Sequence, residues 1–443
     1  MSIKMIIFLH ITNKKDTFSC IIIVEISTTK GGVLNDKLEL KKLLIYMNSV
    51  YQIPKKIKQL SDKRKRKSIP LFNIFMPVLL LLILQYESFH TFFSAPESMK
   101  KRLKHCIRGK IPKVDAVRDS LALADPKELQ TIHESVIQRS FRNRVFQGGT
   151  IGGYLTAAID GVEWFSSTKK KGRGWLKRNT ASGGTEYFAK SVVCATVGGN
   201  PHLILGQEML RPRDGAGKEE GELTGGKHLL ENLNKRYGHF ADVIVADALY
   251  LNAPFINTVL ELGMDAVIRL KDEKRLVFQD AEGLFRQGEG RKADFKRGKV
   301  KIEAWDLSGF EMREVSQKVR VIKYRETERV NGKETHREMY LVTTLEYADY
   351  KILWSMMHKR WDIEENGFHQ LKTYYHAKHC YCKEAVEAVL LLTILGFNIR
   401  ELYLYRRIRN FETSGITRKS VSRKLRDDLL IEDVKEALYR ESG

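Results

Sequence analysis

The chain has 443 residues, 43% of them hydrophobic, so it can fill the cores of two or three domains. Its formal net charge of +22 favours a polyanionic partner such as nucleic acid, although charge alone does not distinguish such a protein from any other basic protein. Five scattered cysteines argue against a disulfide framework and are typical of a cytoplasmic protein.

Residues 1–69 are predicted to be a poorly defined basic segment. The apolar start is not followed by a small-residue cleavage site, so no signal peptide is expected. Residues 1–46 show no sustained amphipathic pattern, and Met47 could serve as an alternative start. We therefore expect a chain that begins at Met47 to fold.

Two strongly apolar runs, residues 78–84 and 386–397, are too short to cross a bilayer. We interpret both as buried helices and expect no membrane partner.

Residues 70–147 are predicted to form a helical unit. Asp125 followed by Pro126 is a good helix start, because Asp caps free backbone N–H groups and Pro suits the first helical position. The basic character of the unit suits contact with nucleic acid, and a purely structural role is the alternative.

Residues 148–270 begin with Gly148-Gly149 and then alternate between strand and helix patterns. The expected strands are residues 154–165, 192–197, 203–205, 242–246 and 266–270, and the expected helices are residues 222–237 and 254–262. Three antiparallel strands followed by helix, strand, helix and strand is the order of an RNase H-like core, so the predicted class is α/β.

The remainder of the chain divides into three predicted parts. Residues 271–345 favour strands and are interpreted as a β-rich insertion. Residues 346–405 are predicted to complete the core with helices, and residues 406–443 to form a basic C-terminal tail.

Two candidate catalytic acids follow apolar strand patterns. Asp160 is expected at the end of the first strand and Asp247 at the end of the fourth, and these strands are neighbours in an RNase H-like sheet. Converging carboxylates in a basic protein suggest divalent metal ions and phosphoryl transfer. A lone Asp at a strand end is more often a turn former or helix cap, so the pairing depends on the fold.

A third candidate acid, Glu364, lies in a predicted helix. It shares one helical stripe with apolar and aromatic residues, namely Met357, Trp361, Phe368 and Leu371. A buried carboxylate requires a partner or a metal ion. The alternatives are a simple Arg360–Glu364 salt bridge and a metal role for the adjacent Glu365.

Four motifs in order resemble the DDE transposases of bacterial insertion sequences, the group typified by insertion sequence four. The motifs are Ala158-Ile-Asp-Gly161, Asp247-Ala-Leu-Tyr250, Ile268-Arg-Leu-Lys271 and Arg360-Trp-Asp-Ile-Glu-Glu-Asn-Gly-Phe-His-Gln-Leu-Lys372. The resemblance covers residues 70–405 and implies an RNase H-like core with a β-rich insertion before the last catalytic helix. It also implies an N-terminal helical DNA-binding unit.

The resemblance implies that Asp160, Asp247 and Glu364 bind Mg²⁺ or Mn²⁺ and are catalytic, and that Arg360 and Lys372 bind DNA phosphates. Two departures stand out: Met357 replaces the Tyr of the family signature, and Lys372 comes one residue late. The shifted lysine has the expected spacing to Glu365, which keeps Glu365 as a rival ligand.

The implied activity is metal-dependent cleavage at element ends and strand transfer into target DNA. The implied partners are double-stranded DNA, both terminal inverted repeats and target, and a second copy of the chain in the DNA complex. A nucleoid-associated location in the cytoplasm follows. The alternatives are a catalytically silent repressor derived from a transposase and a structure-specific nuclease without strand transfer.

Two further clusters give weaker indications of function. His376, His379, Cys380 and Cys382 are too crowded for a standard zinc finger, so a structural role is favoured. The basic, glycine-containing run 169–178 is expected to be a flexible loop that follows phosphates, with a solvated hairpin as the alternative.

Overall fold

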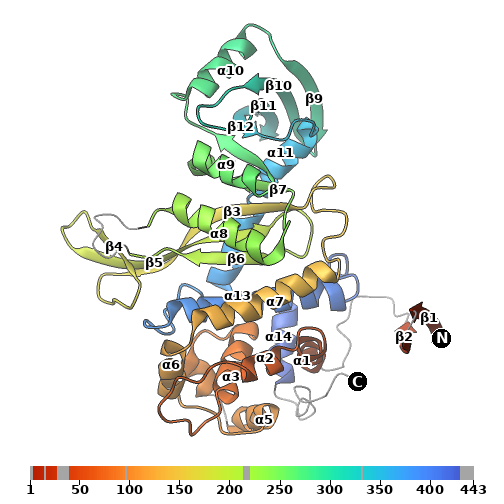
Figure 1. Ribbon diagram of the computed structural model, residues 1–443, viewed down its shortest axis with the longest axis vertical. Helices are drawn as coiled ribbons and strands as arrows, with labels where there is room; N and C mark the ends of the chain where they lie inside the picture. Colours follow the sequence, from red (N-terminus) through yellow and green to blue (C-terminus); the bar gives the residue numbers. More distant parts are fainter. Residues whose placement is uncertain are drawn as a thin grey trace.

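The computed structural model describes residues 3–13, 16–26, 39–94, 97–212, 220–330 and 333–429. Along its long axis the molecule has a helical half at one end, a central sheet flanked by helices, and a twisted extension of that sheet at the other end (Figure 1). The chain is a mixed α/β protein.

A ten-stranded sheet runs through the upper part of the molecule, in the order β4-β5-β3-β7-β8-β12-β11-β10-β9 with β6 paired to β5. Its first part comprises β3 (Thr156–Ser167), β4 (Leu176–Asn179), β5 (Thr185–Thr196), β6 (Ile204–Met209), β7 (Val243–Ala246) and β8 (Asp265–Leu270). The long strand β3 is antiparallel to β5 and parallel to β7, and β7 is parallel to β8. All the strands expected in residues 148–270 are therefore present.

The predicted β-rich insertion continues this sheet. It contains β9 (Arg291–Arg297), β10 (Val300–Phe310), β11 (Val319–Val330) and β12 (Lys333–Thr343). Strand β12 pairs antiparallel with β8, with Tyr340 opposite Leu270, so the insertion and the central sheet share one set of backbone hydrogen bonds. It also contains α10 (Leu276–Arg286), a helix that the sequence interpretation missed. Glu282 anchors α10 by accepting a hydrogen bond from the Tyr340 hydroxyl.

Helices cover both faces of the central sheet. One face carries α8 (Glu222–Tyr237) and α9 (Ala253–Glu261). Gly206 of β6 allows α8 to pack closely, because a Cβ there would lie 2.8 Å from the Leu233 side chain. The other face carries α11 (Tyr350–Lys359), the π-helix η2 (Ile363–His369) and α12 (Gln370–Thr373), and Phe368 packs edge-on against Trp164 of β3.

The helical half combines both ends of the chain. It contains α1 (Glu39–Ser49), α2 (Ile53–Lys58), α3 (Phe72–Ile83), α4 (Phe89–Phe93), α5 (Glu97–Ile107), α6 (Val114–Ala122), α7 (Pro126–Arg142), α13 (Val386–Arg407) and α14 (Arg418–Asp428). The predicted start of α7 is confirmed, because the Asp125 side chain accepts a hydrogen bond from the Lys127 amide.

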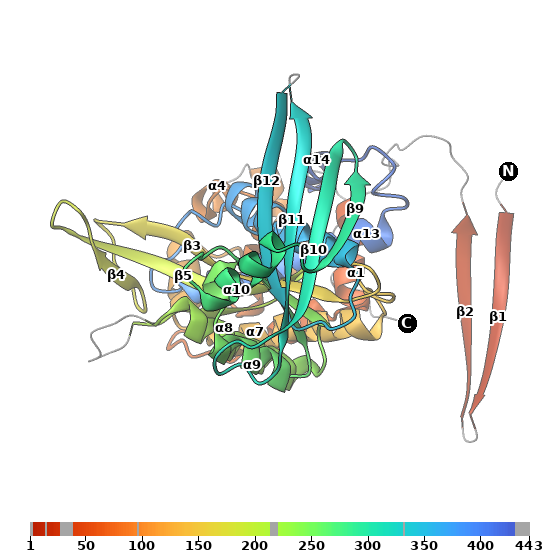
Figure 2. The same cartoon turned by 90° about the horizontal axis from the view of Figure 1, so that it is seen from above.

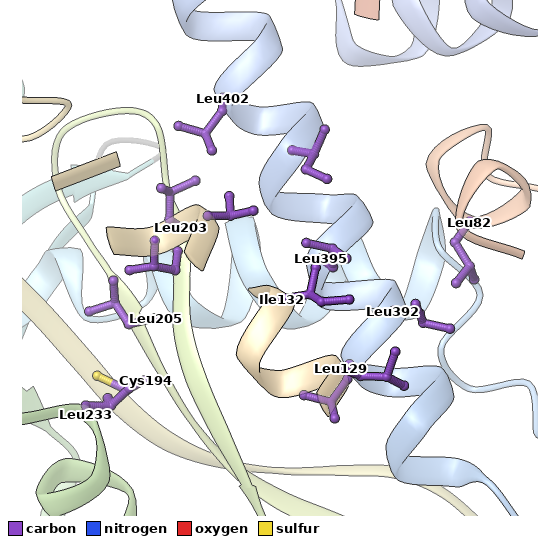
Figure 3. Close-up of a cluster of buried hydrophobic side chains, with 14 of the residues drawn as sticks. Leu82, Leu129, Ile132, Cys194, Leu203, Leu205, Leu233, Leu392, Leu395 and Leu402 are labelled. Carbon is purple, nitrogen blue, oxygen red and sulfur yellow. The ribbon is translucent and has the colours of Figure 1, made fainter. Parts of the chain in front are cut away.

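Apolar side chains of α13 join the helical half to the sheet. Leu392 and Leu395 of α13 lie among Leu129 and Ile132 of α7, and Leu203 and Leu205 of the sheet lie nearby (Figure 3). By length and composition α13 could span a membrane, but 94% of its most apolar window is buried inside the protein. It is the core helix predicted for residues 386–397.

The buried Arg400 and the partly buried Arg418 and Arg426 join α3, α13 and α14. The Arg400 guanidinium donates to the carbonyl oxygens of Ile83 (3.2 Å) and Arg418 (2.8 Å) and to the Ser422 hydroxyl. Arg426 donates to the Leu84 carbonyl at 2.7 Å. Arg418 forms two bonds with the Glu401 carboxylate, at 2.9 and 2.7 Å. Side-chain donors thereby satisfy the last carbonyls of α3.

The structure corrects the interpretation of the C-terminal segment. Residues 418–428, expected as part of a tail, form α14, and its apolar residues Val421 and Leu425 are fully buried. The remaining residues of the expected tail beyond 429 lie outside the described ones.

The structure also corrects the interpretation of the N-terminal segment. Leu40, Leu43 and Leu44 of α1 are fully buried, and the Leu40 amide donates to Asp428 of α14. Residues 39–46 therefore belong to the helical core. The hairpin of β1 (Ile3–Asn13) and β2 (Asp16–Ile26) stands apart from the rest of the molecule in both views (Figures 1 and 2).

Candidate active site

Asp160 and Asp247 lie next to each other on neighbouring parallel strands. The last β3–β7 pair is Ala158 with Val245, and each acid lies two residues past that pair. Because parallel strands run about 4.8 Å apart, this register brings the two acids to the same edge. Asp247 follows β7 directly, as predicted, and its side chain caps the short helix η1 (Ala248–Tyr250).

Asp160 differs from its prediction in one respect. It is not the end of its strand but the fifth residue of β3, which continues to Ser167. The short partner β7 ends at Ala246, so β3 extends past it beside the start of η1. A strand interior is a more rigid position for a functional carboxylate than a strand end.

Arg360 links Glu364 to Asp160. The Arg360 guanidinium contacts the Asp160 carboxylate at 3.2 Å and the Glu364 carboxylate at 3.3 Å. Arg360 itself is only 5% exposed. The Arg360–Glu364 salt bridge that was one alternative for Glu364 is thus present, and Arg360 extends it to a second acid.

The π-helix η2 changes which residues face the sheet. Trp361, expected in the buried stripe, is 50% exposed, and the Arg360 guanidinium lies over its ring at 5.4 Å. The stripe assumed one continuous α-helix, but α11 ends at Lys359 and the wider turns of η2 shift the faces. Ile363 takes the buried position, and Glu365 is exposed while Glu364 is partly buried.

The acids at this edge repel one another. Burial raises the pKa of Asp160 to about 6. Arg360 opposes this shift, whereas Asp247 and Glu222 add to it. The positive charge in the structure therefore only partly compensates the carboxylates. Such an environment favours binding of a further cation.

Glu222, at the start of α8, is a site residue that the sequence interpretation missed. Its carboxylate forms a 2.7 Å ion pair with Lys190 and accepts a 3.0 Å hydrogen bond from the Tyr250 hydroxyl. It lies against Gly161, where a Cβ would be 2.2 Å from Glu222 Oε2. Glu222 thus fixes the backbone after Asp160 and the turn after Asp247. The only signals in the sequence were the small residue in Asp160-Gly161 and the Tyr in Asp247-Ala-Leu-Tyr250.

The two predicted phosphate-binding residues have different environments. Arg360 is buried and occupied by carboxylates, so a phosphate would have to compete for it. Lys372 is half-buried, and burial together with Lys378 lowers the pKa of its ammonium group.

The donor set suits a hard divalent cation, since all three predicted ligands are carboxylates. Among the described residues, however, no three Asp, Glu, His or Cys side chains are close enough to form a ready metal site. The Arg360 guanidinium contacts Asp160 and Glu364 instead. The acids therefore fit a metal ion in chemistry, while Arg360 occupies two of them in this structure.

The two weaker candidate clusters each contain residues that pack against the rest of the protein. Trp175, in the run expected to be a flexible loop, is buried and donates to the Lys383 carbonyl at 3.0 Å, and β4 follows it. Cys382 contacts the Arg118 carbonyl, and His379 packs against the Tyr381 ring.

Comparisons with known proteins agree with the geometry at the level of the family. A family model described as the transposase DDE domain matches residues 152–399. No curated protein sequence matches the chain significantly.

Two solved structures show distant likenesses. The cryo-EM structure of a piggyBac transposase synaptic complex with hairpin DNA has a TM-score of 0.43 at 13% identity, over 89% of this chain and 81% of that one. The crystal structure of the NurA nuclease from Sulfolobus solfataricus has a TM-score of 0.23 at 14% identity, over 46% of this chain and 72% of that one. Neither score is high enough to support an argument. The domain match, which includes Asp160, Asp247 and Glu364 and spans more than half of the sequence, shows that the chain belongs to the transposase DDE domain family.

Proposed function

We propose that this chain is a transposase that cleaves DNA at the ends of its element and joins the exposed 3′ ends to target DNA. The observation that carries the proposal is that acids from three distant segments lie around Arg360 and one sheet edge. Asp160 and Asp247 are brought there by the β3–β7 register and Glu364 by its shared contact with Arg360. Converging carboxylates of this kind suit phosphoryl transfer at a phosphodiester.

The strand order supports an RNase H-like core within this proposal. Strands β6, β5, β3, β7 and β8 lie side by side in that order. If the short edge strand β4 is left aside, the first strand in the chain (β3) lies at the centre, the second and third (β5 and β6) lie on one side of it, and the fourth and fifth (β7 and β8) on the other. Among these five strands only the pairs β3–β7 and β7–β8 are parallel. The fold places the acids, and the chemistry of the site carries the functional argument.

Asp160, Asp247 and Glu364 would hold Mg²⁺ or Mn²⁺. When bound, such ions would activate the attacking oxygen and stabilise charge on the leaving oxygen. Arg360, once released by the two acids, would be free to contact a phosphate of the substrate, and Lys372 would contact another. We assign the third ligand to Glu364 because it already shares Arg360 with Asp160, whereas Glu365 is exposed.

Double-stranded DNA is the proposed partner, and the helical half is the proposed DNA-binding unit. The net charge of +22 supports a polyanionic partner. We further propose that the transposase belongs to the group typified by insertion sequence four, and that two copies bring two element ends together.

The test uses the full chain with labelled duplexes that carry the terminal repeats flanking its own gene. The expected result is Mg²⁺-dependent cleavage at the repeat and transfer of the cut strand to a second duplex. Specific binding without cleavage would support a silent repressor instead. Cleavage without joining would support a nuclease.

A further inference from the structure

A basic groove lies between β9 and α11, next to the active site. It has a volume of about 870 Å³, within the usual range for ligand clefts. Its cationic side chains are Lys296, Arg297, Lys351 and Lys359, and no Asp or Glu is among the described residues that line it. The lining is therefore complementary to an anion, although two carboxylates just outside it contact lining residues: Glu326 bonds Trp354 and His358, and Asp362 pairs with Lys359.

The walls of the groove are apolar and aromatic. Phe295 of β9 and Trp354 of α11 meet edge-on, with ring centroids 5.8 Å apart. Their positions are fixed, because the Trp354 ring nitrogen donates to Glu326 at 2.7 Å. The exposed His358 ring is tilted by 38° against the same indole at a centroid distance of 4.0 Å, and its Nε2 contacts Glu326 at 2.5 Å. The groove therefore offers a flat ring surface beside its positive charges.

Two glycines shape the floor. Gly152 has φ +58°, and a Cβ there would lie 2.8 Å from Ile352 Cδ1. Gly198 has φ +93°, and a Cβ there would lie 2.3 Å from Ile151 Cγ1. Both positions combine a backbone conformation that favours glycine with contact too close for a side chain. The floor thus has a defined shape.

The groove is linked to the candidate active site through Lys359 and Gly198. Lys359 lines it and precedes Arg360, whose guanidinium contacts Asp160 and Glu364. Gly198 of the floor donates its amide to Asp362 at 2.9 Å, and Lys359 pairs with the same carboxylate at 3.6 Å. An anionic chain lying in the groove would therefore contact Lys359, the residue that precedes Arg360.

We propose that this groove binds the DNA backbone that flanks the cleaved phosphodiester, with phosphates on Arg297, Lys351 and Lys359. The exposed face of the His358 ring takes a sugar or an unpaired base of the same strand. Positive charges follow the backbone, and aromatic rings accept any base, a combination typical of sites for a DNA strand. This inference deepens the proposed function and rests on it.

The test compares two double variants that remove the same charge from the same region. Arg297→Ala/Lys351→Ala empties the groove of two cations. Lys299→Ala/Lys301→Ala removes two exposed lysines of the adjoining hairpin that do not line the groove. Affinity for an end-bearing duplex is measured over a range of salt concentrations. The slope of log affinity against log salt should become shallower by roughly 1.8 in the groove variant, about 0.9 per lost phosphate contact, and change little in the control.

A third variant, Ser355→Trp, fills the groove without changing charge, since Ser355 lines it and is partly buried. It should also weaken DNA binding, and its melting temperature reports whether it folds. If it does not fold, the charge variants, which alter exposed side chains, still decide the question. Equal salt slopes in the two double variants would contradict DNA binding in the groove. A wild-type chain that neither binds nor cuts end DNA would instead contradict the proposed function.

Discussion

Arg360 and Arg400 are both buried arginines, yet their surroundings differ in kind. Arg400 donates to backbone carbonyls and a serine hydroxyl that join α3, α13 and α14. Arg360 contacts two carboxylates, at 3.2 and 3.3 Å, and one of them has its pKa raised to about 6. Neutral acceptors surround the Arg400 guanidinium in the helical half, whereas the sheet edge leaves acidic charge only partly compensated.

This difference separates a polar cluster that joins three helices from the one that we propose binds a ligand. Polar groups with complete partners stabilise a unique packing and have no capacity for another molecule. Carboxylates that repel one another and share a single arginine would gain from an added cation. Burial of charge alone would not have distinguished the two arginines.

The largest expected effect is on cleavage. Asp247→Ala and Glu364→Ala should each lower the cleavage rate on the order of 10⁴-fold, as for loss of a central catalytic group, while binding of end DNA is retained. Glu365→Ala should have a much smaller effect, because Glu365 is exposed. Single-turnover cleavage and a binding titration measure the two quantities. If Glu365→Ala were the more damaging change, Glu365 would be the third ligand.

Truncation tests the helical half. A chain that begins at Met47 lacks Leu40, Leu43 and Leu44, all fully buried. At 1.5–3 kcal/mol for each buried side chain, it should lose about 5 kcal/mol of unfolding free energy or more. A chain that begins at Lys37 keeps α1 complete and serves as the control. Denaturant unfolding compares the stabilities of the two chains. Equal midpoints would show that α1 does not contribute to the stability of the fold.

The two arginines can be compared directly. Arg400→Met leaves the carbonyls of Ile83 and Arg418 without this donor and should cost about 3 kcal/mol, with or without Mg²⁺. Arg360→Met should destabilise the metal-free protein less, and added Mg²⁺ should restore it. Thermal melts of both variants in a Mg²⁺ series supply the measurement. Equal responses to Mg²⁺ would contradict the contrast between the clusters.

The pH dependence of stability sharpens the assignment of Asp160. Its carboxyl group has a pKa of about 6 in the folded protein against an ordinary 3.8, so the folded state holds this proton more tightly. Wild-type stability should therefore fall as pH rises from about 4 through about 6, by about 3 kcal/mol from this group. Asp160→Asn should remove that part of the fall. If the stabilities of the two metal-free proteins changed with pH in the same way, the pKa of Asp160 would not be raised in the folded protein.

The smallest effect concerns Gly161. The Cβ of Gly161→Ala would displace the Glu222 carboxylate from Lys190 and Tyr250. We expect this change to lower the free energy of unfolding by about 1 kcal/mol. Cleavage should fall several-fold, because the segments after Asp160 and Asp247 lose a shared anchor. Adding Glu222→Ala removes the collision, so the double variant should lose less than the sum of the single changes. Strict additivity would mean that the two residues do not interact.

Several elements were predictable because one periodic pattern determined them. Helix α8 has the limits expected from its amphipathic pattern, and Asp247 follows a short buried strand as predicted. Helix α14 was missed because Val421 and Leu425 are outnumbered by basic residues and find their partners only in three dimensions.

Within the site, the sequence identified the acids but not their setting. The exposure of Trp361 depends on η2, whose π-type hydrogen bonds have no simple sequence pattern. Glu222 meets Gly161 only through the packing of α8 on the sheet. Sequence periodicity describes single elements, and these features arise where elements meet.

The division of the helical half between the two ends of the chain has a consequence during synthesis. Ile83 and its partner Arg400 are 317 residues apart. At 5–20 residues per second, a ribosome needs roughly 15 to 60 s to cover that distance. Throughout this interval the apolar helix α3, every residue of which is buried in the finished protein, has no α13 to cover it. The nascent chain therefore carries exposed hydrophobic surface for most of its translation, which makes it a natural client for chaperones.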